Sequence, residues 1–185
     1  VGLEDTWTNQ LDLQVDDQDH MEALLSHIST TVHGQSKFSL IEKAQTETKL
    51  HHFLETSNDQ GINEYLLLVK QRTSRSIIAK TRTGVLDLAV ELGRRKNIPH
   101  HERICTQCNN NTVEDGIHFM LDCSAYIMER HVFLNTCREH IPHISRMTSV
   151  EKYISIMKCS NKIVLNEFGK YLIEIHKIRQ NLLKY

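Results

Sequence analysis

The stretch CTQCNNNTVEDGIHFMLDC, residues 105–123, contains three of the five cysteines of this 185-residue chain. Its candidate ligands, Cys105, Cys108, His118 and Cys123, follow the spacing C-x2-C-x9-H-x4-C. Two cysteines two residues apart on a tight turn can direct both thiolates at one ion, and three sulfurs with one imidazole suit a closed tetrahedral zinc site. The pattern therefore predicts a structural Zn2+ that holds a loop with little apolar material of its own.

Two other interpretations of these residues stay open at the level of sequence. Cys105 and Cys108 could be unrelated thiols with His118 on the surface, or they could form a redox pair or disulfide. The redox interpretation is the weaker one, because no thioredoxin-like βαβ pattern surrounds them. A closed four-ligand site has no open coordination position, so the expected role of the metal is structural. Cys137 and Cys159 lie on helical stripes and are expected to be buried core thiols.

The composition of the chain favours helices. Gly (7) and Pro (2) are scarce, and 39% of residues are hydrophobic, which is enough for a core at this length. The clearest helix is the last, with a continuous apolar stripe from Val164 to Leu182. From the helical spacing of apolar residues we predict a mainly α fold of about eight helices with one small zinc-stapled loop or hairpin insertion. The expected helices are near residues 16–32, 36–54, 62–69, 74–80, 86–93, 124–142, 149–158 and 161–183.

The net charge of −1 conceals an asymmetry along the chain. Residues 1–69 carry 12 acidic and 3 basic side chains, residues 70–103 carry 9 basic and 3 acidic ones, and residues 104–185 carry 10 basic and 8 acidic ones. A uniformly basic nucleic-acid-binding protein is thereby excluded, whereas a local basic surface just before the cysteines is not. The alternative for this basic run is an ordinary solvated helix face.

We expect two regions: an acidic helical linker region over 1–72, and a region over 73–185 with basic helices, the zinc element at about 98–124 and the C-terminal helices. No apolar run reaches the roughly 18 residues that span a membrane, and no N-terminal signal pattern is present. We therefore expect an intracellular protein, nuclear or cytoplasmic or both, with no membrane partner. Because the chain begins at Val1 and not at Met, we expect it to be a piece of a longer polypeptide.

No catalytic constellation emerges from the sequence, so the chain is not expected to be an enzyme. Val15-Asp16-Asp17 is similar to the paired aspartates that hold metal ions in nucleotide polymerases, but carboxylates at a helix N-terminus explain it better. The histidine pairs at 51–52 and 100–101 point about 100° apart on a helix, which makes a poor bidentate site. No Ser/His/Asp set, phosphate loop or general acid/base pair is evident.

Residues 75–130 resemble the region that follows the polymerase thumb in reverse transcriptases of non-long-terminal-repeat (LINE-type) retrotransposons. The family carries a zinc-binding-like element with the same Cys-Cys-His-Cys order. The match extends more loosely to residues 2–10 and the helices after them, and Ser124 stands where the family usually has proline. The motifs that carry the resemblance are RSIIAKTRTG (75–84), Pro99, RICTQC (103–108), EDGIHFML (114–121), DCSAY (122–126) and Arg130.

The resemblance implies a non-catalytic C-terminal module, binding nucleic acid or serving a structural role, that positions template RNA or target DNA beside the polymerase domain of the same polypeptide. Phe119 and Tyr126 are expected to pack behind the metal instead of stacking on bases. The alternatives are a domesticated, retroelement-derived protein-interaction module with a purely structural zinc, and a structural appendage with no ligand of its own besides zinc. The basic side chains that could contact phosphates are Arg75, Lys80, Arg82, Arg94, Arg95, Lys96 and Arg103.

Overall fold

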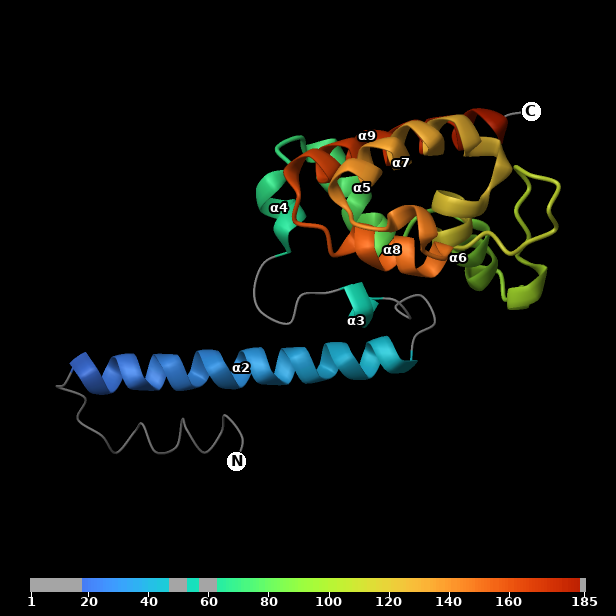
Figure 1. The fold of residues 1–185 in the computed structure, drawn as a ribbon. Helices are drawn as coiled ribbons and strands as arrows, with labels where there is room; N and C mark the ends of the chain where they lie inside the picture. The colour runs from blue at the N-terminus through green and yellow to red at the C-terminus, as the bar shows by residue number, and fades with distance from the viewer. Residues whose placement is uncertain (1–17, 47–52, 57–62, 184–185) are drawn as a thin grey trace. The chain divides into compact units, whose positions relative to one another are not determined.

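The computed structural model describes residues 18–46, 53–56 and 63–183 of the chain (Figure 1). Eight α-helices, α2 to α9, lie within these residues, and one isolated β-bridge is the only extended pairing among them. The predicted mainly α fold of about eight helices is therefore confirmed. Contacts divide the chain into two compact units, Val1–Thr46 and Glu47–Tyr185. The division at residue 72 predicted above rests on charge and stays a prediction.

The described part of the first unit is one helix, α2 (Gln18–Thr46), of 29 residues. The prediction that a helix ends at His33-Gly34 is wrong, because α2 continues through both residues. A glycine inside a helix costs only about 1 kcal/mol relative to alanine, which the neighbouring turns can absorb. Several apolar side chains of α2 are exposed, namely Met21, Leu25, Val32 and Phe38.

The second unit contains the remaining helices, and most of the predicted ranges correspond to one of them. None of the helices in the described residues combines the length and the apolar character that crossing a membrane requires. Residues 47–52, in the expected helix 36–54, lie outside the described residues. The helices are α3 (Phe53–Thr56), α4 (Glu64–Leu68), α5 (Arg72–Arg82), α6 (Ala89–Arg95), α7 (Ile127–His140), α8 (Ser149–Met157) and α9 (Lys162–Leu182).

Helix α9 is the centre of this unit, and α4, α5 and α7 pack against it. The side chain of Asn161 accepts hydrogen bonds from the N–H groups of Ile163 and Val164 at 2.8 and 3.2 Å, which caps the helix at its start. The predicted apolar stripe is buried from Val164 to Ile175, whereas Leu182 is 49% exposed. The stripe thus supplies one wall of the apolar core.

Helices α5 and α9 approach each other closely at Gly169. A Cβ atom added to Gly169 would lie 2.5 Å from the Cβ of Ser74, so only glycine fits at this contact. On the other side of α9, the ring of Phe133 in α7 stacks on Tyr171 with centroids 4.8 Å apart. These contacts fix α5, α9 and α7 as one packed body that supports the loop between α6 and α7.

Candidate metal centre

The first two candidate ligands lie on a short hairpin-like loop. Ile104 and Val113 form an antiparallel bridge, and the N–H of Cys105 donates to the carbonyl of Thr112 at 2.8 Å. Asn111 has a φ of 49°, the left-handed conformation that lets the chain turn back. This geometry confirms the expected loop or small hairpin around Cys105 and Cys108.

The other two ligands are positioned by a wide helical turn. The carboxylate of Asp115 accepts the N–H of His118 at 2.7 Å and so caps the turn at its start. The N–H of Cys123 donates to the carbonyl of His118 at 2.7 Å, a bond across five residues that defines the π-helical turn His118–Asp122. In an α-helix these two side chains would point about 140° apart, so the wider turn is what brings them to one side.

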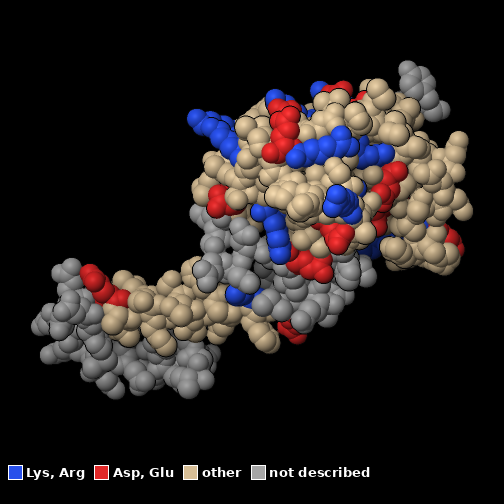
Figure 2. All heavy atoms as spheres, viewed as in Figure 1, with Lys and Arg blue, Asp and Glu red and all other residues tan. Residues whose placement is uncertain are grey.

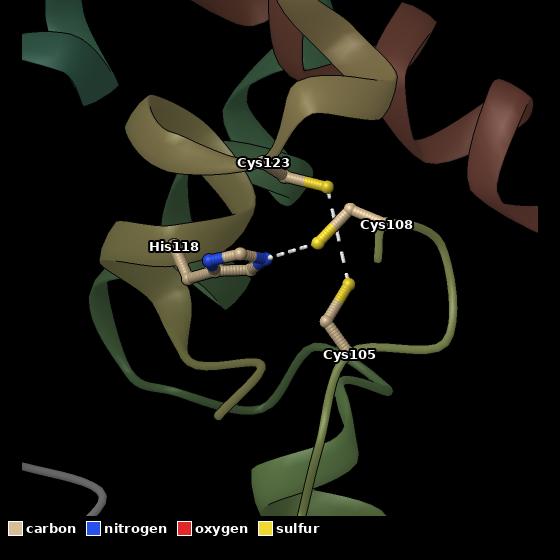
Figure 3. A group of neighbouring side chains, drawn as sticks. All are labelled: Cys105, Cys108, His118 and Cys123. Atoms are coloured by element: carbon tan, nitrogen blue, oxygen red, sulfur yellow. Dashed lines mark hydrogen bonds between the residues drawn. The ribbon is translucent and has the colours of Figure 1, made fainter. Parts of the chain in front are cut away.

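The four side chains converge on one point (Figure 3). Cys105 Sγ lies 3.9 Å from Cys123 Sγ, and Cys108 Sγ lies 3.4 Å from His118 Nε2. All four ligand atoms lie within 4.8 Å of one another. Around a tetrahedral zinc, sulfurs lie about 3.8 Å apart and a sulfur and a nitrogen about 3.5 Å apart, given the usual Zn–S and Zn–N bond lengths. The four residues can therefore hold a metal ion with little movement.

Burial disfavours the thiolate forms of the candidate ligands unless a cation balances their charge. Cys105, His118 and Cys123 are buried, and Cys108 is half-buried. Burial raises the pKa of Cys123 to about 12 and also raises the pKa of Cys105. The N–H of Gln107 points at Cys105 Sγ at 3.4 Å, an arrangement that would stabilise a thiolate there. Buried thiols with raised pKa values lose their protons when a cation takes the protons' place.

Aromatic residues close the back of the centre. Phe119 and Tyr126 are fully buried, and their rings meet edge to face with centroids 5.4 Å apart. Both rings are therefore buried in the core and are not available to stack on bases, as expected. Behind them, Tyr171 of α9 donates its hydroxyl to the carbonyl of Met120, and Arg130 of α7 donates to the carbonyl of Cys123 at 2.7 Å.

A buried ion pair ties the loop to the core. Arg179 of α9 donates two parallel hydrogen bonds to the carboxylate of Glu114, at 2.7 and 2.8 Å, and both side chains are almost fully buried. The same carboxylate accepts the N–H of Ala89, the first residue of α6, at 2.7 Å. Glu114 was noted above only within the motif EDGIHFML, and no role was predicted for Arg179. The one signal was a lone arginine on the apolar stripe of α9.

The seven predicted phosphate contacts separate into two groups. Lys80, Arg94, Arg95 and Lys96 are exposed. Arg94 and Arg95 both donate to Glu91, at 2.7 Å and 3.2 Å, and the bonds from Arg94 hold the pKa of Glu91 below its usual value. Lys96 follows the last residue of α6 directly, so the three residues Arg94, Arg95 and Lys96 form one basic helix end, called the α6 basic end below.

Three of the seven use their guanidinium groups inside the fold. Arg82 is buried and donates to the carbonyls of Met157 and Thr56, so it does not belong to a surface that meets phosphates. Arg75 donates to two carbonyls before α5, at 2.7 and 2.8 Å. Arg103 donates to the carbonyls of Val90 and Ile98, both at 2.9 Å. An arginine inside the fold can bind several backbone carbonyls at once, because its guanidinium has five N–H donors. The sequence does not distinguish such an arginine from one on the surface.

The four candidate metal ligands do not include the other cysteines, the histidine pairs or the aspartates named above. Cys137 is fully buried, as expected, and Cys159 is half-buried against the core. The histidine pair at 100–101 is exposed on a short 3-10 turn. The aspartates of the Val15-Asp16-Asp17 motif and the histidine pair at 51–52 lie outside the described residues.

Comparison with known proteins adds no relative to this description. No protein-family model, no curated protein and no solved structure matches the chain.

Proposed function

We propose that the Cys3His set binds one structural Zn2+ and that the protein is a non-catalytic, intracellular module that binds RNA or DNA for a reverse transcriptase of the non-long-terminal-repeat type. The polymerase domain of the same polypeptide would be its second partner. The ligand set supports zinc, because three thiolates and one imidazole in a closed site favour it over harder cations. The resemblance of residues 75–130 supports the wider context.

The observation that carries the nucleic-acid part is the attachment of the α6 basic end to the candidate metal loop. Glu114, next to the hairpin, holds the first N–H of α6. Arg103, two residues before Cys105, donates to Val90 inside α6 and lies so close to Gly93 that a Cβ there would be 2.6 Å from its Cγ. A metal that orders residues 103–114 therefore also orients the α6 basic end toward a ligand.

Neutralising this basic end tests the proposal. Arg94 must stay, since it is the main partner of the buried carboxylate of Glu91 and its loss would disturb the fold. The test variant is R95Q/K96Q, and the matched control is K162Q/K170Q on α9, where two exposed lysines are changed. The test variant should weaken binding to a labelled RNA or DNA and lower the slope of log affinity against log salt by about 1 to 2, and the control should change both less.

Removing the metal with a chelator should weaken binding of the unaltered protein to a similar degree, because the α6 basic end loses its support. Absence of any RNA or DNA binding at low salt would overturn the nucleic-acid proposal and leave the metal proposal standing. Equal losses of affinity for RNA or DNA in R95Q/K96Q and in the α9 control would show that binding depends only on the net charge of the protein.

One observation favours the alternative of a domesticated protein-interaction module with a purely structural zinc. Helix α2 exposes Met21, Leu25, Val32 and Phe38, and the spacing of the first three places them on one face, where an exposed apolar stripe could contact a protein. Under this alternative, a protein partner would be retained by R95Q/K96Q and lost on replacing the exposed apolar residues of α2 with polar ones. A pull-down with both variants distinguishes the two functions.

A further inference from the structure

An acidic side chain, that of Asp87, lies beside the α6 basic end. Asp87, just before α6, has its Oδ1 3.9 Å from Nη1 of Arg95, and the two side chains are 59% and 55% exposed. Asp87, Glu91 and Arg95 are spaced four residues apart, so the long arginine side chain can reach back toward both carboxylates. The guanidinium of Arg95 is thus held between a buried and an exposed carboxylate.

The two carboxylates differ in what they do for the fold. Glu91 is buried and already has two hydrogen bonds from Arg94, at 3.0 and 2.7 Å. Asp87 is exposed, and an exposed ion pair of this kind adds little to stability. The charge of Asp87 therefore acts mainly on whatever approaches Arg95 from solvent, and an approaching phosphate meets repulsion from it.

The surface continues from Asp87 to α5 and α9. These two helices pack on each other, and His176 of α9 is half-buried between charged neighbours. Burial, Arg179 and Lys80 lower the pKa of His176, whereas Asp87 raises it, so Lys80 and Asp87 both lie near this imidazole. Through Asp87, which pairs with Arg95, the α6 basic end thus has a further exposed cation, Lys80 of α5, in its neighbourhood.

We propose that Arg95 and Lys96, together with Lys80, bind nucleic-acid phosphates and that Asp87 competes with phosphate for Arg95. This inference rests on the proposed nucleic-acid function. A phosphate oxygen that binds Arg95 replaces Asp87 as partner of the guanidinium, so the natural chain binds more weakly than the same surface without the carboxylate. Figure 2 shows cations and anions interspersed on the face it views.

The test is the variant D87N, with E139Q as the matched control. Glu139 is exposed on α7, which packs on α9, so E139Q removes the same charge from a different helix. With a labelled single-stranded RNA and a matching DNA as probes, D87N should bind about threefold more tightly at low salt, an advantage that added salt reduces. The double variant D87N/R95Q should lose this gain, and unchanged zinc content and thermal unfolding would show that the folds are equal.

The outcomes separate this inference from the function on which it rests. If D87N binds RNA or DNA more tightly and E139Q does not, both proposals are supported, even if the natural chain binds too weakly to measure. If the natural chain binds and D87N matches it, or if E139Q gains as much as D87N, the role of Asp87 is wrong and the nucleic-acid function stands. If neither the natural chain nor D87N binds RNA or DNA, both proposals are overturned, even if both proteins bind the polyanion heparin.

Discussion

The core around α9 and the loop around the four ligands are held together by different forces. Along α9, the side chains from Val164 to Ile175 that face the core are fully or almost fully buried among other apolar groups. Between Cys105 and Val113, the loop consists of polar residues, and Thr106, Asn109, Asn110, Asn111 and Thr112 are exposed. Apolar burial can stabilise the first region by itself, whereas the second has almost no apolar area to bury.

The difference indicates that the loop depends on its ligand and on a few polar contacts with the core. Those contacts are the ion pair of Glu114 with Arg179, the bond from Arg130 to Cys123, and the hydroxyl of Tyr171 on Met120. All of them start on α7 or α9 and end within residues 114–123, the segment that carries two of the candidate ligands. The core thus acts as a support, and the proposed zinc supplies the order that the loop sequence lacks.

Removing the metal should reveal the largest difference between the loop and the α9 core. Structural zinc sites contribute on the order of 10 kcal/mol of apparent binding energy, so a chelator should have the largest effect. We expect amide hydrogen exchange to become fast over residues 105–113, while the amides of α9 keep their protection. Equal loss of protection in both regions would contradict the separation, and unchanged exchange in the loop would remove the role of the metal.

Breaking the ion pair should have the next largest effect, because it connects the two regions. R179M leaves the buried carboxylate of Glu114 without its partner, which costs about 3–5 kcal/mol. The double variant E114Q/R179M removes both charges and should recover a large part of that loss. Free energies of unfolding from urea titrations measure both, and a double variant no more stable than R179M would show that the charges are not what couples loop and core.

A cavity in the core should lower stability without affecting the metal. Leu172 is fully buried in α9, so L172A should cost about 2–5 kcal/mol. The control is L182A on the same helix, where the side chain is 49% exposed and the loss should be small. Folded L172A should retain the full zinc content of the unaltered chain. A loss of zinc in parallel with stability would contradict the independence of the two regions.

The sequence predicted the parts of the molecule that depend on local pattern. The apolar stripe of α9 and the four candidate ligands could be predicted because residue spacing determines which side chains share a helix face or can reach one ion. The continuity of α2 through Gly34 was missed because a helix tolerates one glycine when its neighbours favour helix. The pairing of Glu114 with Arg179, 65 residues apart, and the burial of Arg82 were missed because only the packed chain brings such groups together.

A smaller effect is expected at the start of α9. Asn161 accepts two backbone N–H groups, and N161A removes both bonds, which should cost about 1 kcal/mol. N161D should recover most of the loss, since a carboxylate also caps and suits the positive end of the helix dipole. Urea titration of the three proteins measures the difference, and an N161A protein as stable as the original would show that the cap is not needed.

The smallest effect concerns pH. Burial, together with Arg179 and Lys80, lowers the pKa of His176, although Asp87 opposes the shift. The unfolded chain therefore takes up this proton more readily than the folded one, so the contribution of His176 to stability is present above its usual pKa and is lost as pH falls below about 6.5. H176Q should lose slightly less stability between pH 7 and pH 5 than the original chain, as measured by thermal unfolding; an identical acid loss would contradict this assignment.

X-ray absorption at the zinc edge of the purified protein, together with the zinc content per chain, tests whether Cys105, Cys108, His118 and Cys123 bind one zinc ion. We expect one zinc per chain, with three sulfurs at about 2.3 Å and one nitrogen at about 2.0 Å. A chain purified without chelators that contains no zinc, or zinc bound only by oxygen and nitrogen, would contradict this expectation.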